Sequence, residues 1–304
     1  MGRPDTHDDP ISRTDIDAAR VAGAGTVKHT PVTESYALSE MCGGNVVLKA
    51  ENLQRTGSFK IRGAMNKIAT LGDAAASGVV AGSAGNHAQS IAFAARKRGI
   101  PCRIYVPAGA SLSKMESVRS YGADLYEGGD SLSDAVALAQ EHARSSGMNF
   151  CHPFDDAAVM AGQATLGLEL IEDVKDLAQV IIPLGGGGLA GGVALAIKQH
   201  NPGVRIIGVQ VLACAPYAGM PPADGPVVTL ADGIAVKWPG EITRPVVERY
   251  VDDIVVVDEE SVADAMMLLM DRSKLYVEGG GAVGVAALMS GLVTPSAKGA
   301  TCAV

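Results

Sequence analysis

Residues 181–190 of this chain read Ile-Ile-Pro-Leu-Gly-Gly-Gly-Gly-Leu-Ala, and an apolar periodic stretch follows them as far as His200. This order indicates a buried strand, a glycine loop and a helix. Glycines at a helix start expose backbone N–H groups that have no partner within the helix and that favour a phosphate group. A mobile surface loop is the alternative interpretation, but the apolar strand and helix on either side argue against it.

Gly185, Gly187 and Ala190 also match the G-x-G-x-x-A spacing of dinucleotide-binding sites. Such a site requires an acidic residue about 20 residues further on, at the end of the next strand. The next expected strand, residues 204–209, is followed by Gln210, and neither it nor the two residues after it are acidic. The loop therefore favours a phosphate site and disfavours a NAD-binding oxidoreductase.

Lys60 lies in the run Ser-Phe-Lys-Ile-Arg-Gly-Ala at residues 58–64. In an apolar pocket the charged form of a lysine is disfavoured, so a neutral amine becomes available as a base or as a Schiff-base nucleophile. The alternative is a solvated lysine in the first turn of a helix capped by Ser58. A reactive lysine together with a phosphate site suggests pyridoxal 5'-phosphate (PLP) as the cofactor.

Five further segments accompany this run in the order of a known family: Ser-Ala-Gly-Asn-His-Ala at 83–88, His-Pro-Phe-Asp-Asp at 152–156, Gly-Gly-Gly-Gly-Leu at 185–189, Ala-Asp-Gly-Ile-Ala-Val-Lys at 231–237 and Glu-Gly-Gly-Gly-Ala at 278–282. With these motifs the chain resembles the fold-type II PLP enzymes, specifically the serine/threonine dehydratases (ammonia-lyases), from about residue 11 to its last residue. The resemblance implies an α/β protein of two lobes, similar to tryptophan synthase β, in which each lobe is a mostly parallel sheet flanked by helices.

The composition excludes several classes of protein. The 304 residues exceed what one core comfortably serves, and 47% of them are hydrophobic. Apolar runs stay short of the ~18 residues that a membrane span needs, and the polar N-terminus resembles neither a secretory signal nor a transit peptide. A net charge of −8 argues against nucleic acid or an anionic membrane as partner. The five cysteines lack C-x-x-C spacing, which is typical of thiols in a reducing cytoplasm.

Strands and helices alternate in two sets. In the first set, strands are expected at residues 79–82, 103–106, 124–127 and 148–151, with helices at 88–98, 114–121 and 132–145. In the second set, strands are expected at residues 180–183, 204–209 and 254–257, with helices at 166–174, 189–199, 260–275 and 282–290. This repetition predicts parallel sheets covered by helices. We expect a small mobile lobe at 76–152 and a large PLP-binding lobe made of 1–75 and 153–304. In the helix at 260–275 one face is predicted to belong to the core, and it carries Val262, Met266, Leu269 and Met270.

The resemblance also implies roles for individual residues. Lys60 would be catalytic and would hold PLP covalently, Phe59 would pack against its ring, and Asn86 would bond its phenolic oxygen. The phosphate would be held by Gly185, Gly186, Gly187, Gly188 and Leu189. The substrate carboxylate would be held by the loop of Ser83, Ala84, Gly85, Asn86 and His87, for which an ordinary helix cap is the alternative.

Two side chains stay open. His87 could be a general base, but a structural role is favoured because it lies near an Asn-capped helix start. Glu278 would lie near the pyridine edge by resemblance, or would be a solvated carboxylate at a helix start.

Three departures from the family pattern bear on the reaction. Ala84 stands where the family's serine racemases carry a second serine, which favours one-base elimination over racemisation. Gln210, Cys214 and Pro216 occupy the stretch where some members hold a divalent cation, so no metal site is expected. The family continues past a strand like residues 300–304 into a Ser-Gly-Gly-Asn segment whose serine bonds the pyridine nitrogen. We therefore expect a truncated large lobe whose last strand leaves core surface exposed.

The expected reaction is β-elimination from a small hydroxy-amino acid. The freed Lys60 amine would remove the Cα proton, the β-hydroxyl would leave, and L-threonine (or L-serine) would give 2-oxobutyrate (or pyruvate) and ammonia. A PLP-dependent racemase and a truncated PLP-binding fragment with little activity are the alternatives. A cytoplasmic homo-oligomer, dimer or tetramer, is expected, in threonine catabolism or isoleucine biosynthesis.

Overall fold

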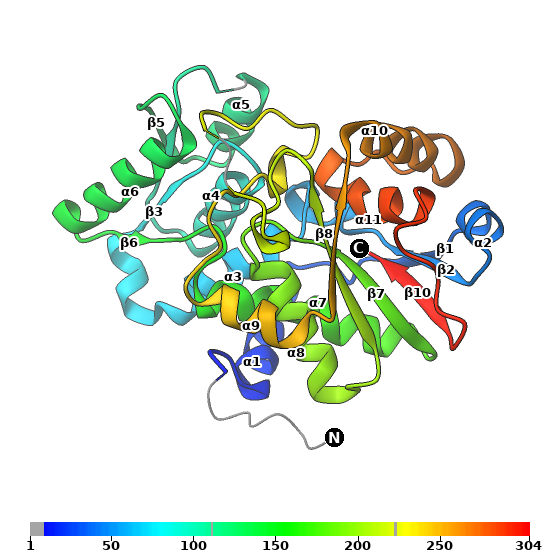
Figure 1. The fold of residues 1–304 in the computed structure, drawn as a ribbon. Helices are drawn as coiled ribbons and strands as arrows, with labels where there is room; N and C mark the ends of the chain where they lie inside the picture. Colours follow the sequence, from blue (N-terminus) through cyan, green and yellow to red (C-terminus); the bar gives the residue numbers. More distant parts are fainter. Residues whose placement is uncertain (1–8, 111, 222–223) are drawn as a thin grey trace.

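The computed structural model describes residues 9–110, 112–221 and 224–304, and two β-sheets organise them (Figure 1). The smaller sheet has the strand order β5-β4-β3-β6, and its strands pair in parallel. Its strands are β3 (Val79–Gly82), β4 (Cys102–Val106), β5 (Asp124–Glu127) and β6 (Asn149–Phe150).

The larger sheet has the order β1-β2-β10-β7-β8-β9. Strands β1 and β2 pair antiparallel, and the other neighbours pair in parallel. Its strands are β1 (Val32–Glu34), β2 (Val46–Lys49), β7 (Leu177–Pro183), β8 (Arg205–Val211), β9 (Asp253–Val257) and β10 (Ala300–Ala303).

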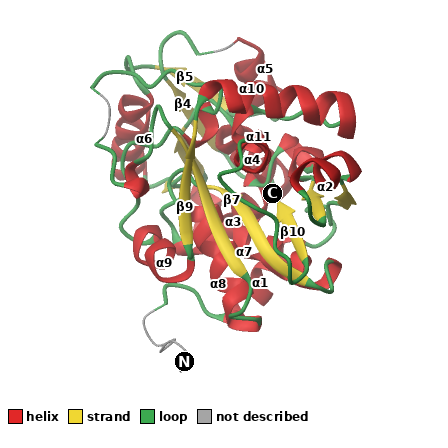
Figure 2. Cartoon of the chain, turned by 45° about the vertical axis from the view of Figure 1, so that its right-hand side comes forward, coloured by secondary structure: helices red, strands yellow, loops and turns green. Residues whose placement is uncertain are grey.

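Helices cover both faces of the larger sheet, as Figure 2 shows. One layer contains α1 (Arg13–Gly23), α7 (Ala157–Asp173), α8 (Gly188–His200) and α9 (Thr243–Tyr250). The other layer contains α2 (Tyr36–Cys42), α10 (Glu259–Leu268) and α11 (Gly279–Met289). The smaller sheet is flanked by α4 (Asn86–Arg98), α5 (Leu112–Ser120) and α6 (Leu132–Ser146).

Strand β7 of the larger sheet is apolar on both faces because each face meets a helical layer. Val180 and Ile182 of β7 belong to the core under α7 and α8, whereas Ile181 belongs to the core under α11. Strands buried on both faces read as continuous apolar runs rather than as an alternation. The run at residues 180–183 is such a strand.

Helix α3 (Lys60–Thr70) joins the two sheets. Its residues Ile61, Ala64 and Ile68 pack in the core of the smaller sheet, and the helix also packs against α1 and α7. The start of α3 therefore lies at the junction of the two sheets (Figure 1).

The expected strands at 79–82 and 124–127 coincide with β3 and β5, but the expected helix at 166–174 is too short. Helix α7 begins at Ala157. A Cβ on Gly162 would lie 2.5 Å from the backbone of Gly63 in α3, and one on Gly167 would lie 2.9 Å from the backbone of α8. A glycine in a sequence often marks the end of a helix. These two glycines lie inside α7 instead, because the neighbouring helices pack too closely there for a side chain.

The predicted apolar face of the helix at 260–275 is wrong at its end. Val262 and Leu269 are buried and Met266 is half-buried, but Met270 is 54% exposed. The chain passes from α10 into a π-helical turn (Leu269–Ser273), and this changes the angular spacing on which the prediction relied.

The prediction that strand 300–304 leaves core surface exposed is also wrong. Strand β10 lies in the middle of the larger sheet, between β2 and β7, and its four residues are buried. Cys302 faces the core under α7 and α8, and Ala303 faces the core under α11. Both faces of this strand are therefore covered.

Candidate active site

Lys60 is the first residue of α3, and its amine lies inside the structure. Nζ donates a hydrogen bond to the carbonyl of Pro153 at 2.7 Å and lies 5.3 Å from the centre of the Phe59 ring. Burial lowers the pKa of Lys60 to about 8. The neutral amine, which a base or nucleophile requires, is therefore far more populated near physiological pH than in an ordinary lysine.

The helix start at Lys60 differs in detail from the alternative of a Ser58 cap. The N-cap residue is Phe59, and it makes no side-chain capping bond. The Ser58 hydroxyl instead accepts the Lys60 amide at 3.4 Å. Lys60 is directed to the junction of the two sheets and is not a solvated lysine.

The glycine loop ends β7 and starts α8. Gly187 is the N-cap residue with φ of +95°, a left-handed conformation that L side chains rarely adopt, and no side chain caps the helix. By helix geometry the first amides of α8 lack an intrahelical partner, and the helix dipole favours an anion there. Leu189 is buried behind them in the core of the larger sheet. The geometry of the loop thus suits an anion.

Neighbouring side chains fix the carbonyl side of this loop. The Gly186 carbonyl accepts a hydrogen bond from the Thr243 hydroxyl at 2.6 Å and one from the Tyr217 hydroxyl at 3.5 Å. A Cβ on Gly187 would lie 2.5 Å from the Tyr217 oxygen. Sequence reasoning missed Tyr217 and Thr243, since no motif marks them and they meet the loop only through the fold.

The other glycines are required by close packing. A Cβ on Gly186 would lie 2.4 Å from the Phe154 ring, and one on Gly188 would lie 2.9 Å from the Phe154 carbonyl. A Cβ on Gly185 would lie 3.0 Å from the backbone of Ile234. This packing excludes the alternative of a mobile surface loop.

A second uncapped helix start belongs to α4. Gly85 is its N-cap residue and makes no side-chain capping bond, while the Ser83 hydroxyl accepts the Gly85 amide at 3.2 Å. Ala84 packs against the core of the smaller sheet, and a Cβ on Gly85 would meet no atom within 4 Å. The loop therefore faces open space beside exposed amides, which suits a carboxylate.

His87 has a structural environment. It is 4% exposed, and its Nε2 donates to the Cys151 carbonyl at 2.9 Å. Burial, with a further contribution from the positive charge of Lys60, lowers the pKa of His87 to about 3. The ring is neutral at physiological pH, and this bond occupies its Nε2 proton.

Asn86 and Glu278 link the two sheets across the site. The Asn86 side-chain amide, at the start of α4, donates to the Glu278 carboxylate at 2.7 Å. Glu278 is the N-cap residue of α11. The exposed Glu278 is therefore not merely a solvated carboxylate.

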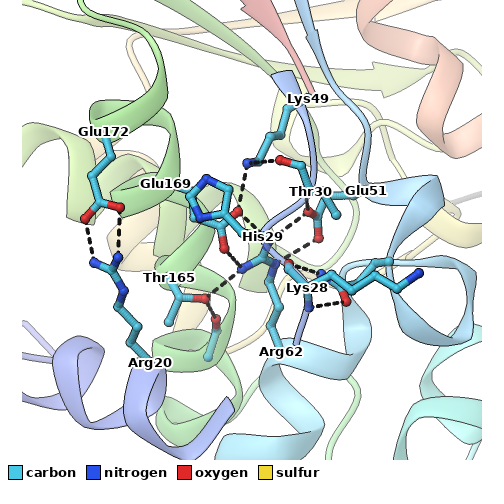
Figure 3. Close-up of polar contacts among 12 residues, drawn as sticks. Arg20, Lys28, His29, Thr30, Lys49, Glu51, Arg62, Thr165, Glu169 and Glu172 are labelled. Carbon is cyan, nitrogen blue, oxygen red and sulfur yellow. Dashed lines mark hydrogen bonds and ion pairs between the residues drawn. The ribbon is translucent and has the colours of Figure 1, made fainter. Parts of the chain in front are cut away.

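Buried ion pairs hold the first turn of α3 in place (Figure 3). Arg62, whose side chain is 1% exposed, pairs with Glu51 at 2.8 Å and with Glu169 of α7 at 2.6 Å. Glu169 also pairs with Lys49 at 2.7 Å, and Lys49 pairs with Asp173 at 3.2 Å. Charges taken out of water are retained where they are paired in this way.

These residues fit a cofactor that carries an aldehyde and a phosphate. The amine of Lys60 has a lowered pKa, and the four glycines form a cradle that any Cβ at Gly186 or Gly187 would fill. The uncapped start of α8 supplies the amides for the phosphate.

Comparison with known proteins agrees with this site. Residues 24–301 match the sequence profile of the pyridoxal-phosphate-dependent enzyme family. The chain belongs to this family. The prediction from the sequence motifs, a PLP enzyme with an α/β fold, is thereby confirmed.

Two curated relatives are similar over most of the chain. The L-threonine ammonia-lyase of Thermotoga maritima is 46% identical over 289 residues, covering 93% of this chain and 72% of that protein. The catabolic L-threonine dehydratase of Escherichia coli is 44% identical over 292 residues, covering 94% and 89%.

Solved structures share the fold. Maize serine racemase has a TM-score of 0.90 and 35% identity, covering 95% of this chain and 91% of that one. The processed form of threonine deaminase isoform 2 from Solanum lycopersicum has a TM-score of 0.87 and 31% identity, covering 96% and 89%. Among the described residues, no helix is long and apolar enough to cross a membrane.

Proposed function

We propose that this protein is a PLP-dependent threonine ammonia-lyase, which converts L-threonine to 2-oxobutyrate and ammonia. L-Serine is the second substrate and gives pyruvate and ammonia. The observation that carries the proposal is the buried Lys60 amine, set at a sheet junction with two uncapped helix starts. The names of the two curated relatives support the same reaction.

Each site residue has a proposed role. The catalytic residue is Lys60. The cofactor is held by Phe59, Lys60, Asn86, Gly185, Gly186, Gly187, Gly188 and Leu189. The substrate is held by Ser83, Ala84, Gly85, Asn86 and His87. Because the His87 ring bonds the Cys151 carbonyl, its contribution is its backbone amide at the start of α4.

When bound, PLP supplies a conjugated ring that accepts the electron pair released at Cα. The protein supplies position and proton transfer. The neutral Lys60 amine takes the Cα proton at Nζ, and the Pro153 carbonyl orients that nitrogen. The amides at the start of α4 hold the substrate carboxylate, and those at the start of α8 hold the cofactor phosphate.

A racemase is the nearest alternative, and the shared fold does not separate the two reactions, since serine racemase and threonine deaminase structures match this chain about equally. Ala84 favours elimination because its methyl side chain has no proton to exchange on the face opposite Lys60. A NAD-dependent enzyme is disfavoured by Gln210, which is buried and whose side-chain oxygen accepts the amides of Tyr217 and Ala218 at 2.9 and 3.1 Å.

The proposed lobes are 76–152 for the small mobile lobe, with 1–75 and 153–304 forming the large one. The partition of the strands supports this division, with β3 to β6 in one sheet and the remaining strands in the other. Helix α3 packs on both. We propose a cytoplasmic homo-oligomer, a dimer or tetramer, as the working form.

The test is the formation of 2-oxobutyrate from L-threonine by the purified chain with PLP. Lys60→Ala should abolish both turnover and the visible absorbance of lysine-bound cofactor, because it removes the covalent anchor and the base. Circular dichroism should show that the fold is retained. Wild-type rates in Lys60→Ala would refute the site, and D-serine formation from L-serine without deamination would identify a racemase.

A further inference from the structure

The segment His-Pro-Phe-Asp-Asp at residues 152–156 joins β6 to α7 and touches both parts of the proposed cofactor site. The Pro153 carbonyl accepts the Lys60 amine at 2.7 Å. The ring of the next residue, Phe154, packs so closely on Gly186 that a Cβ added there would lie 2.4 Å from it. Two consecutive residues therefore set the lysine and the glycine loop relative to each other.

His152 folds this segment into a tight turn. Its Nδ1 accepts the backbone amide of Asp155 at 2.7 Å and that of Phe154 at 3.3 Å. A backbone amide can only donate, so Nδ1 carries no proton. The arrangement is the histidine counterpart of a turn in which an Asn or Asp side chain accepts amides two and three residues further on.

The far end of the segment is anchored separately. The Asp155 carboxylate accepts the amides of residues 241–243 at the start of α9, at 2.8 to 3.0 Å. The Asp156 carboxylate accepts the Val159 amide as the cap of α7 and pairs with Lys67 of α3 at 2.5 Å. The orientation of Pro153 and Phe154 between β6 and these anchors then depends on the His152 turn.

The surroundings of the ring keep Nδ1 available. Burial lowers the pKa of His152, the carboxylates of Asp155 and Asp156 oppose this, and the positive charge of Lys60 on α3 adds to the lowering. His87 of α4 also faces this group and is neutral at physiological pH.

We propose that His152 is a positioning residue, whose ring nitrogen holds the turn that presents the Pro153 carbonyl to Lys60 and the Phe154 ring to Gly186. The inference rests on the proposed function, since it takes Lys60 and the glycine loop as the cofactor site. His152 itself touches neither substrate nor cofactor in this role.

Three substitutions separate acceptor geometry from size and polarity. His152→Asn places an oxygen at the same bond distance from the backbone as Nδ1 and keeps the acceptor. His152→Leu has similar bulk but no acceptor. His152→Gln keeps a polar amide but moves its oxygen one bond outward, and it serves as the comparison if the leucine variant does not fold.

The readouts are the Kd for PLP measured on cofactor-free protein, the visible absorbance of lysine-bound PLP, and kcat and KM for L-threonine. His152→Leu and His152→Gln should weaken PLP binding and lower kcat by tenfold to about a hundredfold, because two hydrogen bonds to amides are lost. KM should change less, since the loop at the start of α4 is untouched. His152→Asn should stay within about threefold of wild type.

Wild-type PLP affinity and kcat in both the leucine and the glutamine variants would overturn the inference, and so would an asparagine variant as impaired as the other two. The PLP titration needs no substrate. If the wild-type protein binds PLP through Lys60 but does not deaminate threonine, the proposed reaction fails and the PLP titration still decides the role of His152.

Discussion

Lys60 and Arg62 lie two residues apart at the start of α3, and their side chains meet opposite electrostatic environments. Lys60 donates to a carbonyl and, among the described residues, has no carboxylate within ion-pair distance, whereas Arg62 lies between Glu51 and Glu169. Burial without a counter-charge favours the neutral form, and burial with two counter-charges retains the ion. One residue therefore becomes a candidate base and the other an anchor.

The lowered pKa of Lys60 has a direct consequence for cofactor capture. Only the neutral amine attacks the PLP aldehyde, so the rate of capture by cofactor-free protein should rise with pH and level off above a midpoint near 8. An unperturbed lysine would give a midpoint near 10.4. Stopped-flow absorbance across this range measures the midpoint, Lys60→Ala gives the background, and a midpoint near 10 would contradict the burial argument.

Ala84 is the residue that should separate elimination from racemisation. Ala84→Ser adds a hydroxyl to the loop at the start of α4, where it can return a proton to the face of Cα opposite Lys60. We expect measurable D-serine from L-serine in the variant, together with slower deamination, and none in wild type. Chiral chromatography of recovered serine checks this, and equal D-serine in both proteins would remove Ala84 from the argument.

At the scale of elements, the site is made by helix starts rather than by side chains that reach into a cleft. Neither α4 nor α8 has a side-chain cap, whereas the cap of α7 is Asp156 and that of α10 is Asp258. The amides that a cap would occupy at α4 and α8 remain for the ligand, which has the charge that a helix start favours.

Gly187→Ala should damage the start of α8. Its φ of +95° disfavours any side chain, and a Cβ would lie 2.5 Å from the Tyr217 oxygen. Strain of about 1–3 kcal/mol at the phosphate loop should weaken PLP binding by about fivefold to a hundredfold. Fluorescence titration with PLP measures this.

Gly191→Ala in the same helix is the matched control. Its Cβ would make ordinary contacts of 3.4 to 3.6 Å with Val246 and Val247, so PLP affinity should be unchanged. Equal affinity in the Gly187 and Gly191 variants would place the phosphate elsewhere.

At the scale of the whole molecule, the buried ion pairs connect segments that are remote in the sequence. Arg62 and Glu169 are separated by 107 positions, and Glu169 and Lys49 link α7 to the end of β2 (Figure 3). The network lies behind the turn that carries Lys60. Loss of one member leaves another charge buried without its partner, which costs more than the pair contributes.

Glu169→Ala should therefore lower the free energy of unfolding by about 3–5 kcal/mol, because Arg62 and Lys49 both lose a carboxylate. Glu248→Ala is the control, since its pair with Arg244 is exposed to solvent and should contribute little to stability. Urea denaturation of the cofactor-free proteins measures both. Similar losses in the two variants would show that the network does not act as a buried unit.

The same network predicts acid sensitivity. Burial raises the pKa of Glu169, but the hydrogen bonds and charges of Arg62 and Lys49 outweigh it and hold the pKa below its ordinary value. A carboxyl group whose pKa is lower in the folded state stabilises the fold above its unfolded pKa of about 4.3, and this contribution is lost as pH falls through the folded value. As pH is lowered from neutral to 3, the urea midpoint of unfolding should fall for the wild type and should fall less for Glu169→Gln. An equal fall in the two proteins would exclude Glu169 as a source of the acid sensitivity.

Several features followed from the sequence because they depend on local chemistry. The strands expected at 79–82 and 124–127 match β3 and β5 at both ends, and the four glycines predicted the uncapped start of α8. Lys60 was identified from a short motif. Residue period, turn chemistry and helix capping act over a few residues, so they can be read along the chain.

Other features exist only in the folded molecule. The hydrogen-bond partner of Lys60 is a carbonyl 93 positions away. The glycine loop is held by the hydroxyl groups of Tyr217 and Thr243. The Asp155 carboxylate accepts an amide at the start of α9. Met270 is exposed, not buried, because a π-helical turn changes the angular spacing of the side chains there. Such contacts join residues that no local pattern relates, and tertiary packing alone determines which of them meet and which charges lose water.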